Sequence, residues 1–435
     1  MLGDHWDRDR RHRWRRYRTR WRLWLVLHRR RLLVAASGLL FFTVLKLWQS
    51  FQSYRRHQAW NVPALPPHQV QAFTSSLRHE TQRFKPDTRG IVLPLFDDIA
   101  LLGFSLILEL RRLLVPLPIE IPHCGDLSLN LQKKMQIRIH PEPSALLRGP
   151  GSLHHKFRSF DIKVLAVVYS EFQEVMLLDA DTLFFQSPMT LWETTKYKST
   201  GTLFFNDRIS YELSYLAKRM SSEHENVGAL HQFLAGLMYL HFSFQPSEFL
   251  LNSHVWSLRS GHQMDSSLML WNKARQPKAT VILASFVSLN GLPTVPSYGD
   301  KELYWLACEL AETAYEFSDF AAGTVGWELL AEGRHKDGVL CGDALQHYPV
   351  QKNPAKGPGA DVEPLYMNSD NILEWGRDSR RLYRTAARPA EFYPGSFTER
   401  KLLQTCPFDV TTMEIAPMEA MLLAQRQQLY DVVAG

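Results

Sequence analysis

Two carboxylates end an otherwise apolar segment near the middle of the chain. The apolar run 175–178 is followed by Asp179 and Asp181, and apolar residues resume at Leu183. Burying carboxylates without a partner is costly, so a cation or a hydrogen-bond network must offset their desolvation. Hard oxygen ligands suit Mn²⁺ or Mg²⁺, which can bridge to a diphosphate and neutralise its charge as it leaves. The pair therefore predicts a metal-diphosphate site, with Asp181 as the first choice of direct ligand.

Two other interpretations of the acidic pair stay open. Short acidic pairs often cap helices or turns. A phosphatase that forms an aspartyl-phosphate also presents two aspartates after a strand. That class usually carries Thr or Val two places after the second aspartate, where Leu183 stands.

The elements around the pair predict an α/β domain with a largely parallel sheet, because apolar runs bounded by turn residues alternate with helical patterns. Ligands of open α/β sheets collect at the carboxyl ends of strands, which is where the acidic pair falls. We expect strands at 90–94, 117–121 and 174–178, helices at 100–114 and 413–433, a helix or strand at 160–169, and a surface loop at 352–359. The first strand, helix and second strand form one predicted βαβ unit.

The amino-terminal end predicts a membrane anchor. Residues 1–31 hold 12 Arg and 3 Asp, and residues 32–48 are almost uncharged and long enough for a short membrane-spanning helix. The arginines should keep residues 1–31 in the cytoplasm, so that residues 49–87 form a stem and residues 88–435 a luminal catalytic domain. A cleaved signal peptide is the rival, but no small-residue cleavage site follows the apolar run.

The charge distribution and the cysteine spacing argue against two further classes of protein, nucleic-acid-binding proteins and zinc ribbons. Beyond residue 31 acidic residues slightly outnumber basic ones, so no basic nucleic-acid-binding surface is expected. The four cysteines have no C-x-x-C spacing, which argues against a zinc ribbon. In an oxidising lumen they allow up to two disulfides, and the sequence does not choose among the pairings.

Several ordered segments resemble one family, the fungal Golgi α-1,3-mannosyltransferases. Besides the acidic pair, the resemblance rests on four segments between about Gly90 and Trp375. They are Tyr169-Ser170-Glu171-Phe172, Thr200 to Arg208, Asp265-Ser266-Ser267-Leu268-Met269-Leu270-Trp271-Asn272-Lys273, and Gly299-Asp300-Lys301-Glu302-Leu303-Tyr304-Trp305-Leu306. The resemblance implies a GT-A fold, Rossmann-like, in which the acidic pair holds Mn²⁺ against the diphosphate of GDP-mannose. In one departure, Ser267 stands where family members commonly carry Gly.

The resemblance also implies roles for residues outside the acidic pair, each with a plainer alternative. Asp265 and Asp300 are candidate catalytic groups that hold sugar hydroxyls or stabilise charge at the anomeric carbon. His347 is the candidate third metal ligand, or a structural histidine. The candidate substrate-binding residues, which could equally form local salt bridges or a solvated surface, are Asp207, Arg208, Ser266, Lys273 and Lys301.

The leading hypothesis is a single-pass type II Golgi enzyme, anchored through residues 32–48, that moves mannose from GDP-mannose to a mannose-terminated glycan. An α-linked product from an α-linked donor would retain configuration, by either a covalent intermediate or same-face attack. Two alternatives remain, a non-catalytic nucleotide-sugar-binding subunit of a Golgi glycosyltransferase complex and a UDP-sugar-dependent transferase. The acceptor, the linkage position and the oligomeric state stay open.

Overall fold

The fold is known from a computed structural model of the 435-residue chain. It describes residues 78–79, 81–134, 160–209, 214–220, 227–239, 244–288, 294–331, 334–350, 362–375, 381–391 and 411–435. The predicted cytoplasmic tail, the anchor at 32–48, most of the stem and the loop at 352–359 lie outside these residues. Within the described ranges, no helix is both long and apolar enough to span a bilayer.

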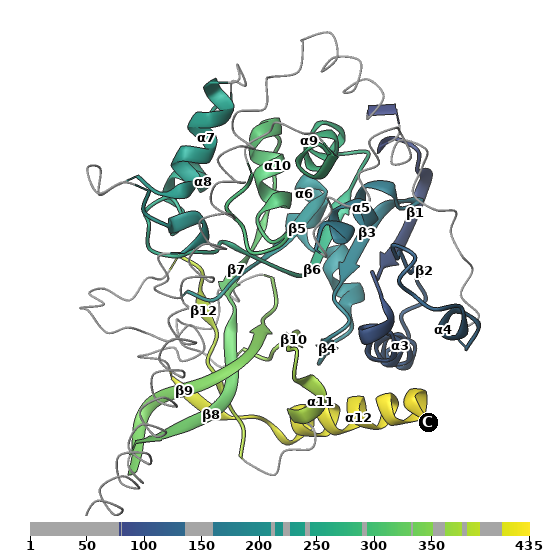
Figure 1. Ribbon diagram of the computed structural model, residues 1–435. Coiled ribbons are helices and arrows are strands. Elements are labelled where there is room, and N and C mark those ends of the chain that lie inside the picture. Colours follow the sequence, from purple (N-terminus) through teal and green to yellow (C-terminus); the bar gives the residue numbers. More distant parts are fainter. Residues whose placement is uncertain are drawn as a thin grey trace, which may run out of the picture. The chain divides into compact units, whose positions relative to one another are not determined.

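The first of two β-sheets is mixed and has seven strands (Figure 1). Its order is β12 (Arg388–Pro389), β7 (Phe317–Ala321), β5 (Thr202–Asn206), β6 (Met264–Asn272), β3 (Phe172–Leu178), β1 (Lys85–Val92) and β2 (Ile119–Glu120). The βαβ prediction is confirmed, because β1 and β2 are parallel and α3 (Asp97–Arg112) connects them. The expectation of a largely parallel sheet is wrong, because β6 inserts antiparallel to both β3 and β5.

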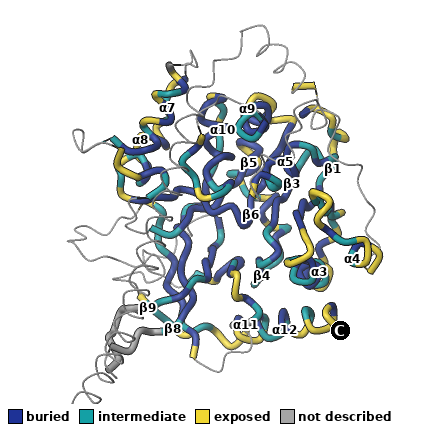
Figure 2. Tube along the Cα trace, in the orientation of Figure 1, coloured by how far each residue is buried: buried dark blue, intermediate teal, exposed yellow. Residues whose placement is uncertain are grey.

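Alternation along the strands gives this sheet two apolar faces. On β3, Val175 and Leu177 join one buried cluster, and Met176 and Leu178 join another. Successive side chains of a strand point to opposite faces, so a run of consecutive apolar residues is what a strand covered on both sides requires. Helices α5 (Asp161–Tyr169), α9 (Pro277–Ser288) and α10 (Leu303–Ala311) cover the first face, and α3 covers the second (Figures 1 and 2).

A second, antiparallel sheet was not predicted. Its order is β13 (Thr412–Glu414), β11 (Tyr383–Thr385), β8 (Gly323–Ala331), β9 (Arg334–His347), β10 (Tyr366–Asn368) and β4 (Thr182–Phe184). The chain passes from the first sheet to the second three times, between β3 and β4, between β7 and β8, and between β12 and β13.

The remaining helices lie around the two sheets. They are α4 (Leu129–Lys134), α6 (Thr195–Thr200), α7 (Ala229–Tyr239), α8 (Glu248–Asn252), α11 (Ile372–Trp375) and α12 (Pro417–Ala434). The predicted carboxyl-terminal helix is thus confirmed as α12, which runs past α11 and α3 (Figure 1).

Candidate functional site

The acidic pair occupies the turn that joins the two sheets. Asp179 directly follows Leu178, the last residue of β3, and Asp181 directly precedes Thr182, the first residue of β4. The backbone N–H of Thr182 donates to the Asp179 carbonyl at 3.2 Å, and that of Asp179 donates to the Ser267 carbonyl of β6 at 2.9 Å. These bonds fix the turn at the carboxyl end of β3, the position that the sequence predicts.

Asp181 is a half-buried carboxylate with negative neighbours. The Asn368 side-chain amide donates to its Oδ1 at 2.9 Å, and the Ser369 N–H donates to its carbonyl at 3.3 Å. Burial raises the pKa of Asp181 to about 8, and the nearby charges of Asp179 and Asp370 act in the same direction. An added cation would relieve this repulsion and favour the ionised carboxylate.

Asp179 is joined to Asp300 through a lysine that sequence reasoning missed. Lys163, on α5, lies 2.7 and 2.8 Å from the two carboxylate oxygens of Asp179 and 3.6 Å from Oδ1 of Asp300. The Tyr304 hydroxyl donates to the other oxygen of Asp300 at 2.9 Å. Burial raises the pKa of Asp179 to about 6, although the Lys163 charge opposes this shift. Lys163 was detectable as the one basic residue of a largely apolar helix, because charged groups are rarely buried without a partner.

Asp265, near the start of β6, is held by three side chains. His347 Nε2 lies 2.8 Å from its Oδ2, the Ser267 hydroxyl donates to the same oxygen, and Lys301 Nζ lies 3.8 Å from Oδ1. Burial raises the pKa of Asp265, but His347 and Lys301 outweigh this effect and hold it well below its ordinary value. Asp265 is therefore a buried, ionised carboxylate.

Asp207 and Arg208 follow β5 at the same edge of the sheet. Lys301 Nζ lies 2.7 Å from Asp207 Oδ2, and the Arg208 guanidinium donates to the Gly342 carbonyl at 3.0 Å. Burial raises the pKa of Asp207, but Lys301 and His262 outweigh it and lower the pKa below its ordinary value. Lys301 thus links Asp207 to Asp265 in one charged network.

The structure brings most of the predicted site residues together. A connected network of ion pairs, hydrogen bonds and close charges contains Asp179, Asp181, Asp207, Asp265, Asp300, Lys301 and His347. Arg208 is adjacent in the chain, and Ser266 is buried between Asp265 and Ser267. Carboxylates outnumber the lysines and arginine that face them, so the cluster is suited to a cation.

Lys273 does not belong to this cluster. It follows the far end of β6, where Asn272 pairs with Glu174 at the start of β3, and its ammonium donates to the Ser170 carbonyl. Eight residues of extended chain separate it from Asp265, which is roughly 26 Å. A strand that runs the full length of its neighbours places its two ends at opposite edges of the sheet, so Lys273 lies away from the acidic turn.

His347 is not grouped with the acidic pair as a metal ligand. Among the described residues, no three His, Cys, Asp or Glu groups are arranged to hold a metal ion. The Nε2 atom of His347 faces Asp265 instead, and its ring stacks on Tyr366 with a centroid distance of 4.5 Å. Pairing explains this placement, because Tyr366 of β10 lies between His347 of β9 and Phe184 of β4.

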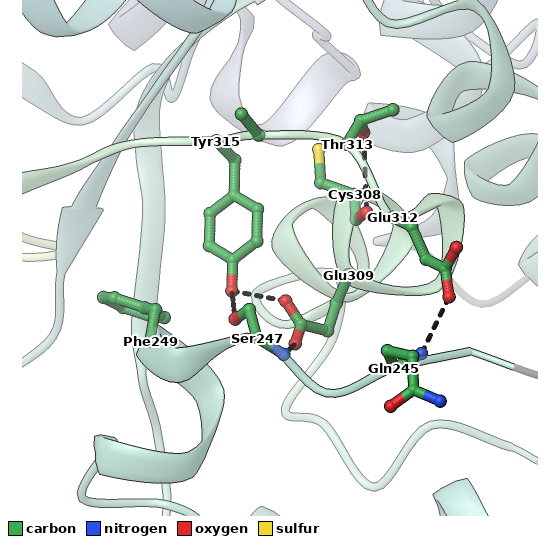
Figure 3. Close-up of a pocket in the computed structure, with 9 residues that line it drawn as sticks. Gln245, Ser247, Phe249, Cys308, Glu309, Glu312, Thr313 and Tyr315 are labelled. Carbon is green, nitrogen blue, oxygen red and sulfur yellow. Dashed lines mark hydrogen bonds between the residues drawn. The ribbon is translucent and has the colours of Figure 1, made fainter.

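A separate pocket lies at the far end of α10 from the charged network (Figure 3). It has a volume of about 410 Å³ and contains none of the predicted site residues. Its carboxylate Glu309 already accepts from the Ser247 N–H at 2.6 Å and from the Tyr315 hydroxyl at 2.7 Å. Glu312 accepts from the Gln245 N–H at 2.8 Å. The pocket is therefore braced by internal hydrogen bonds and is not part of the candidate site.

Comparison with known proteins places the chain among mannosyltransferases. Residues 88–348, more than half of the chain, match the family described as "Mannosyltransferase putative". "Putative alpha-1,3-mannosyltransferase MNN14" of Candida albicans is 26% identical over 260 residues, which cover 55% of this chain and 36% of that protein. "Alpha-1,3-mannosyltransferase MNN1" of Saccharomyces cerevisiae is 24% identical over 301 residues, which cover 61% of this chain and 39% of that protein. The chain thus matches somewhat over a third of the length of these relatives.

Among solved structures, the galactosyltransferase LgtC in complex with donor and acceptor sugar analogs is 12% identical, with a TM-score of 0.32. The match covers 53% of this chain and 73% of that one, and at this TM-score it does not bear on the fold. The family match alone is decisive. The chain belongs to the mannosyltransferase family whose members its residues 88–348 match.

Proposed function

We propose that this chain is a metal-dependent glycosyltransferase that moves mannose from GDP-mannose to a mannose-terminated glycan, forming an α-1,3 linkage with retention of configuration. The observation that carries the proposal is the acidic turn between β3 and β4, which places Asp179 and Asp181 at the carboxyl end of a central strand. Membership of a mannosyltransferase family supplies the sugar.

The chemistry of the turn fits a divalent ion. Asp181 offers a hard oxygen ligand, and burial, together with the charges of Asp179 and Asp370, raises its pKa, an effect that a bound cation would oppose. Asp179 keeps both oxygens close to Lys163, so we assign Asp181 as the direct ligand and Asp179 as its supporting neighbour. Bound Mn²⁺ or Mg²⁺ would neutralise the charge of the departing diphosphate.

The surrounding residues would bind and orient the donor. The guanidinium of Arg208 and the ammonium of Lys301 lie on the same edge as the turn and carry the charge that phosphate oxygens attract. Asp265 and Asp300 are buried carboxylates that can accept hydrogen bonds from sugar hydroxyls or stabilise positive charge at the anomeric carbon. In this proposal His347 orients Asp265 instead of holding the metal.

The cellular setting is part of the same proposal. An anchor at 32–48 with arginines on its amino-terminal side would give a type II Golgi membrane protein with residues 88–435 in the lumen.

A non-catalytic nucleotide-sugar-binding subunit is the second candidate. It is favoured by the contacts of Asp265, since Ser267, His347 and Lys301 already surround the carboxylate that would act on the sugar.

Mannose transfer by the purified full-length chain distinguishes these candidates. The enzyme should release GDP from GDP-mannose when Mn²⁺ and a mannose-terminated acceptor are present, and NMR of the product should show an α-1,3 linkage. Competition between GDP and UDP for binding in Mn²⁺ identifies the donor. Binding of GDP-mannose without transfer to any of a broad acceptor panel would favour the binding subunit, and a preference for UDP would overturn GDP-mannose as the donor.

A further inference from the structure

A buried arginine of the carboxyl-terminal helix contacts the peptide between the two aspartates. The side chain of Arg426, on α12, is fully buried. Its Nη2 donates to the Ala180 carbonyl at 2.8 Å and to the Leu102 carbonyl at 3.2 Å. Ala180 lies between Asp179 and Asp181, so a side chain of α12, which runs beside α11 and α3 (Figure 1), reaches the turn itself.

Through Glu109, the same arginine is linked to Phe184, at the far end of the segment that begins at Ala180. Arg426 Nη1 lies 2.6 Å from Oε2 of Glu109, a buried residue of α3. Oε1 of Glu109 accepts from the backbone N–H of Phe184, the last residue of β4, at 2.8 Å. The ion pair therefore forms hydrogen bonds to both ends of the segment from Ala180 to Phe184, since Arg426 binds the first residue and Glu109 the last.

A buried ion pair is a poor way to gain stability, because desolvation of the two charges offsets much of their attraction. Its particular effect is geometric, since planar donors and a carboxylate fix the directions of the groups that they bind. The Ala180 carbonyl belongs to the peptide that leads directly into Asp181. Fixing the orientation of that peptide limits where the Asp181 carboxylate can point.

We propose that Arg426 and Glu109 are positioning residues for the metal-binding turn, so that α12, which lies beyond the family-matched residues 88–348, completes the site. The inference rests on the proposed function where it concerns the metal. The bracing of the turn is independent of that function.

The chain supplies a matched control. Arg384, on β11, is also buried and forms an ion pair with Glu419 of α12, at 3.3 Å between Nε and Oε1. This pair ties α12 to the second sheet through β11 rather than to the acidic turn. Arg426→Met and Arg384→Met thus each remove one buried arginine that contributes to the packing of α12, and only the first removes a contact to the turn.

Hydrogen exchange of the full-length protein, followed by mass spectrometry, tests the brace without metal or substrate. We expect amides of the segment 179–184 to exchange at least tenfold faster in Arg426→Met than in wild type, relative to the central part of β3 as internal reference. In Arg384→Met the same amides should stay within twofold of wild type. Equal exchange of the segment in the two variants would overturn the proposal. Arg426→Lys, whose single ammonium can replace only some of the contacts of the guanidinium, should restore part of the protection.

Binding of Mn²⁺ in the presence of GDP, measured by calorimetry on the same samples, tests the consequence for the site. We expect Arg426→Met to bind Mn²⁺ about tenfold more weakly and Arg384→Met to bind it as wild type does. Unchanged affinity in Arg426→Met would refute the positioning role even if exchange increases. If wild type itself binds no Mn²⁺, the proposed function fails, and the exchange comparison alone still decides whether α12 braces the turn.

Discussion

Replacing Asp181 by Asn should stabilise the metal-free protein, and the gain should grow as the pH rises. Burial and the neighbouring Asp179 and Asp370 raise the pKa of Asp181 to about 8 in the folded chain, against an ordinary value of 3.8. Between these pH values the folded state holds a proton that the unfolded state has lost. The free energy of unfolding therefore falls as the pH rises through this range, and the unfavourable contribution is complete above about pH 8.

The structure sets the size of the effect. From pH 5.5 to pH 8 is about 2.5 pH units, and each unit corresponds to about 1.4 kcal/mol, which gives a ceiling of about 3.5 kcal/mol. Asp181 remains partly exposed, so solvent screens some of the repulsion, and we expect about half of this ceiling. The substitution Asp181→Asn adds little strain of its own, because the oxygen of the introduced amide can still accept from Asn368 as the carboxylate does.

Urea unfolding of the full-length chain in a chelator, at pH 5.5 and pH 9, measures the difference. Asp181→Asn should gain about 1–2 kcal/mol more over wild type at pH 9 than at pH 5.5. Asp98→Asn, at an exposed position in the first turn of α3, serves as the control and should show no such gain. A gain that is the same at both pH values, or a loss at pH 9, would refute the reasoning that the acidic turn stores unfavourable charge.

Three further predictions concern other parts of the fold. Burial lowers the pKa of Lys273 to about 7, so the charged side chain lowers the free energy of unfolding. This destabilisation is complete below pH 7 and vanishes as the pH rises past about 10.5. In urea titrations, Lys273→Met should therefore raise the free energy of unfolding by about 2 kcal/mol at pH 6.5 and by little at pH 10. Lys163→Met should destabilise the protein by about 3 kcal/mol at pH 7 by leaving buried carboxylates unpaired, and less at pH 5, where Asp179 is protonated; equal losses at both pH values would contradict this pairing. Cys341 is disulfide-bonded while Cys124 and Cys308 are free, so peptide mapping under non-reducing conditions should find Cys341 in a disulfide and Cys124 and Cys308 as thiols, and a link between Cys341 and either of these two would contradict the structure.

The position of the acidic turn was predictable because it follows from the apolar pattern of a single strand, β3. Four consecutive apolar residues before Asp179 indicate a strand that is buried on both faces, and polar residues that end such a strand must lie at the edge of the sheet. The same local logic predicts the βαβ unit and α12, since their patterns are complete within each element.

The sequence could not predict the direction of individual strands or contacts between residues that lie far apart in the chain. The segment from Asp265 to Lys273 is buried along its whole length, so alternation says nothing about whether it runs parallel or antiparallel, or about which of its two ends lies beside the acidic turn. The second sheet pairs strands that lie far apart in the chain, such as β4 with β10. The contact of Arg426 with Ala180 spans more than half of the chain and leaves no periodic signal.

In the proposed function, the turn between β3 and β4 binds a divalent ion, which in turn binds a nucleotide diphosphate. Titration of GDP into the purified full-length chain, with Mn²⁺ and then with a chelator, tests it most directly, with Asp181→Ala as the comparison. Binding of GDP should require the ion and should be lost in Asp181→Ala, while this variant stays folded by circular dichroism. Binding of GDP that survives the chelator, or that is unchanged in folded Asp181→Ala, would contradict it.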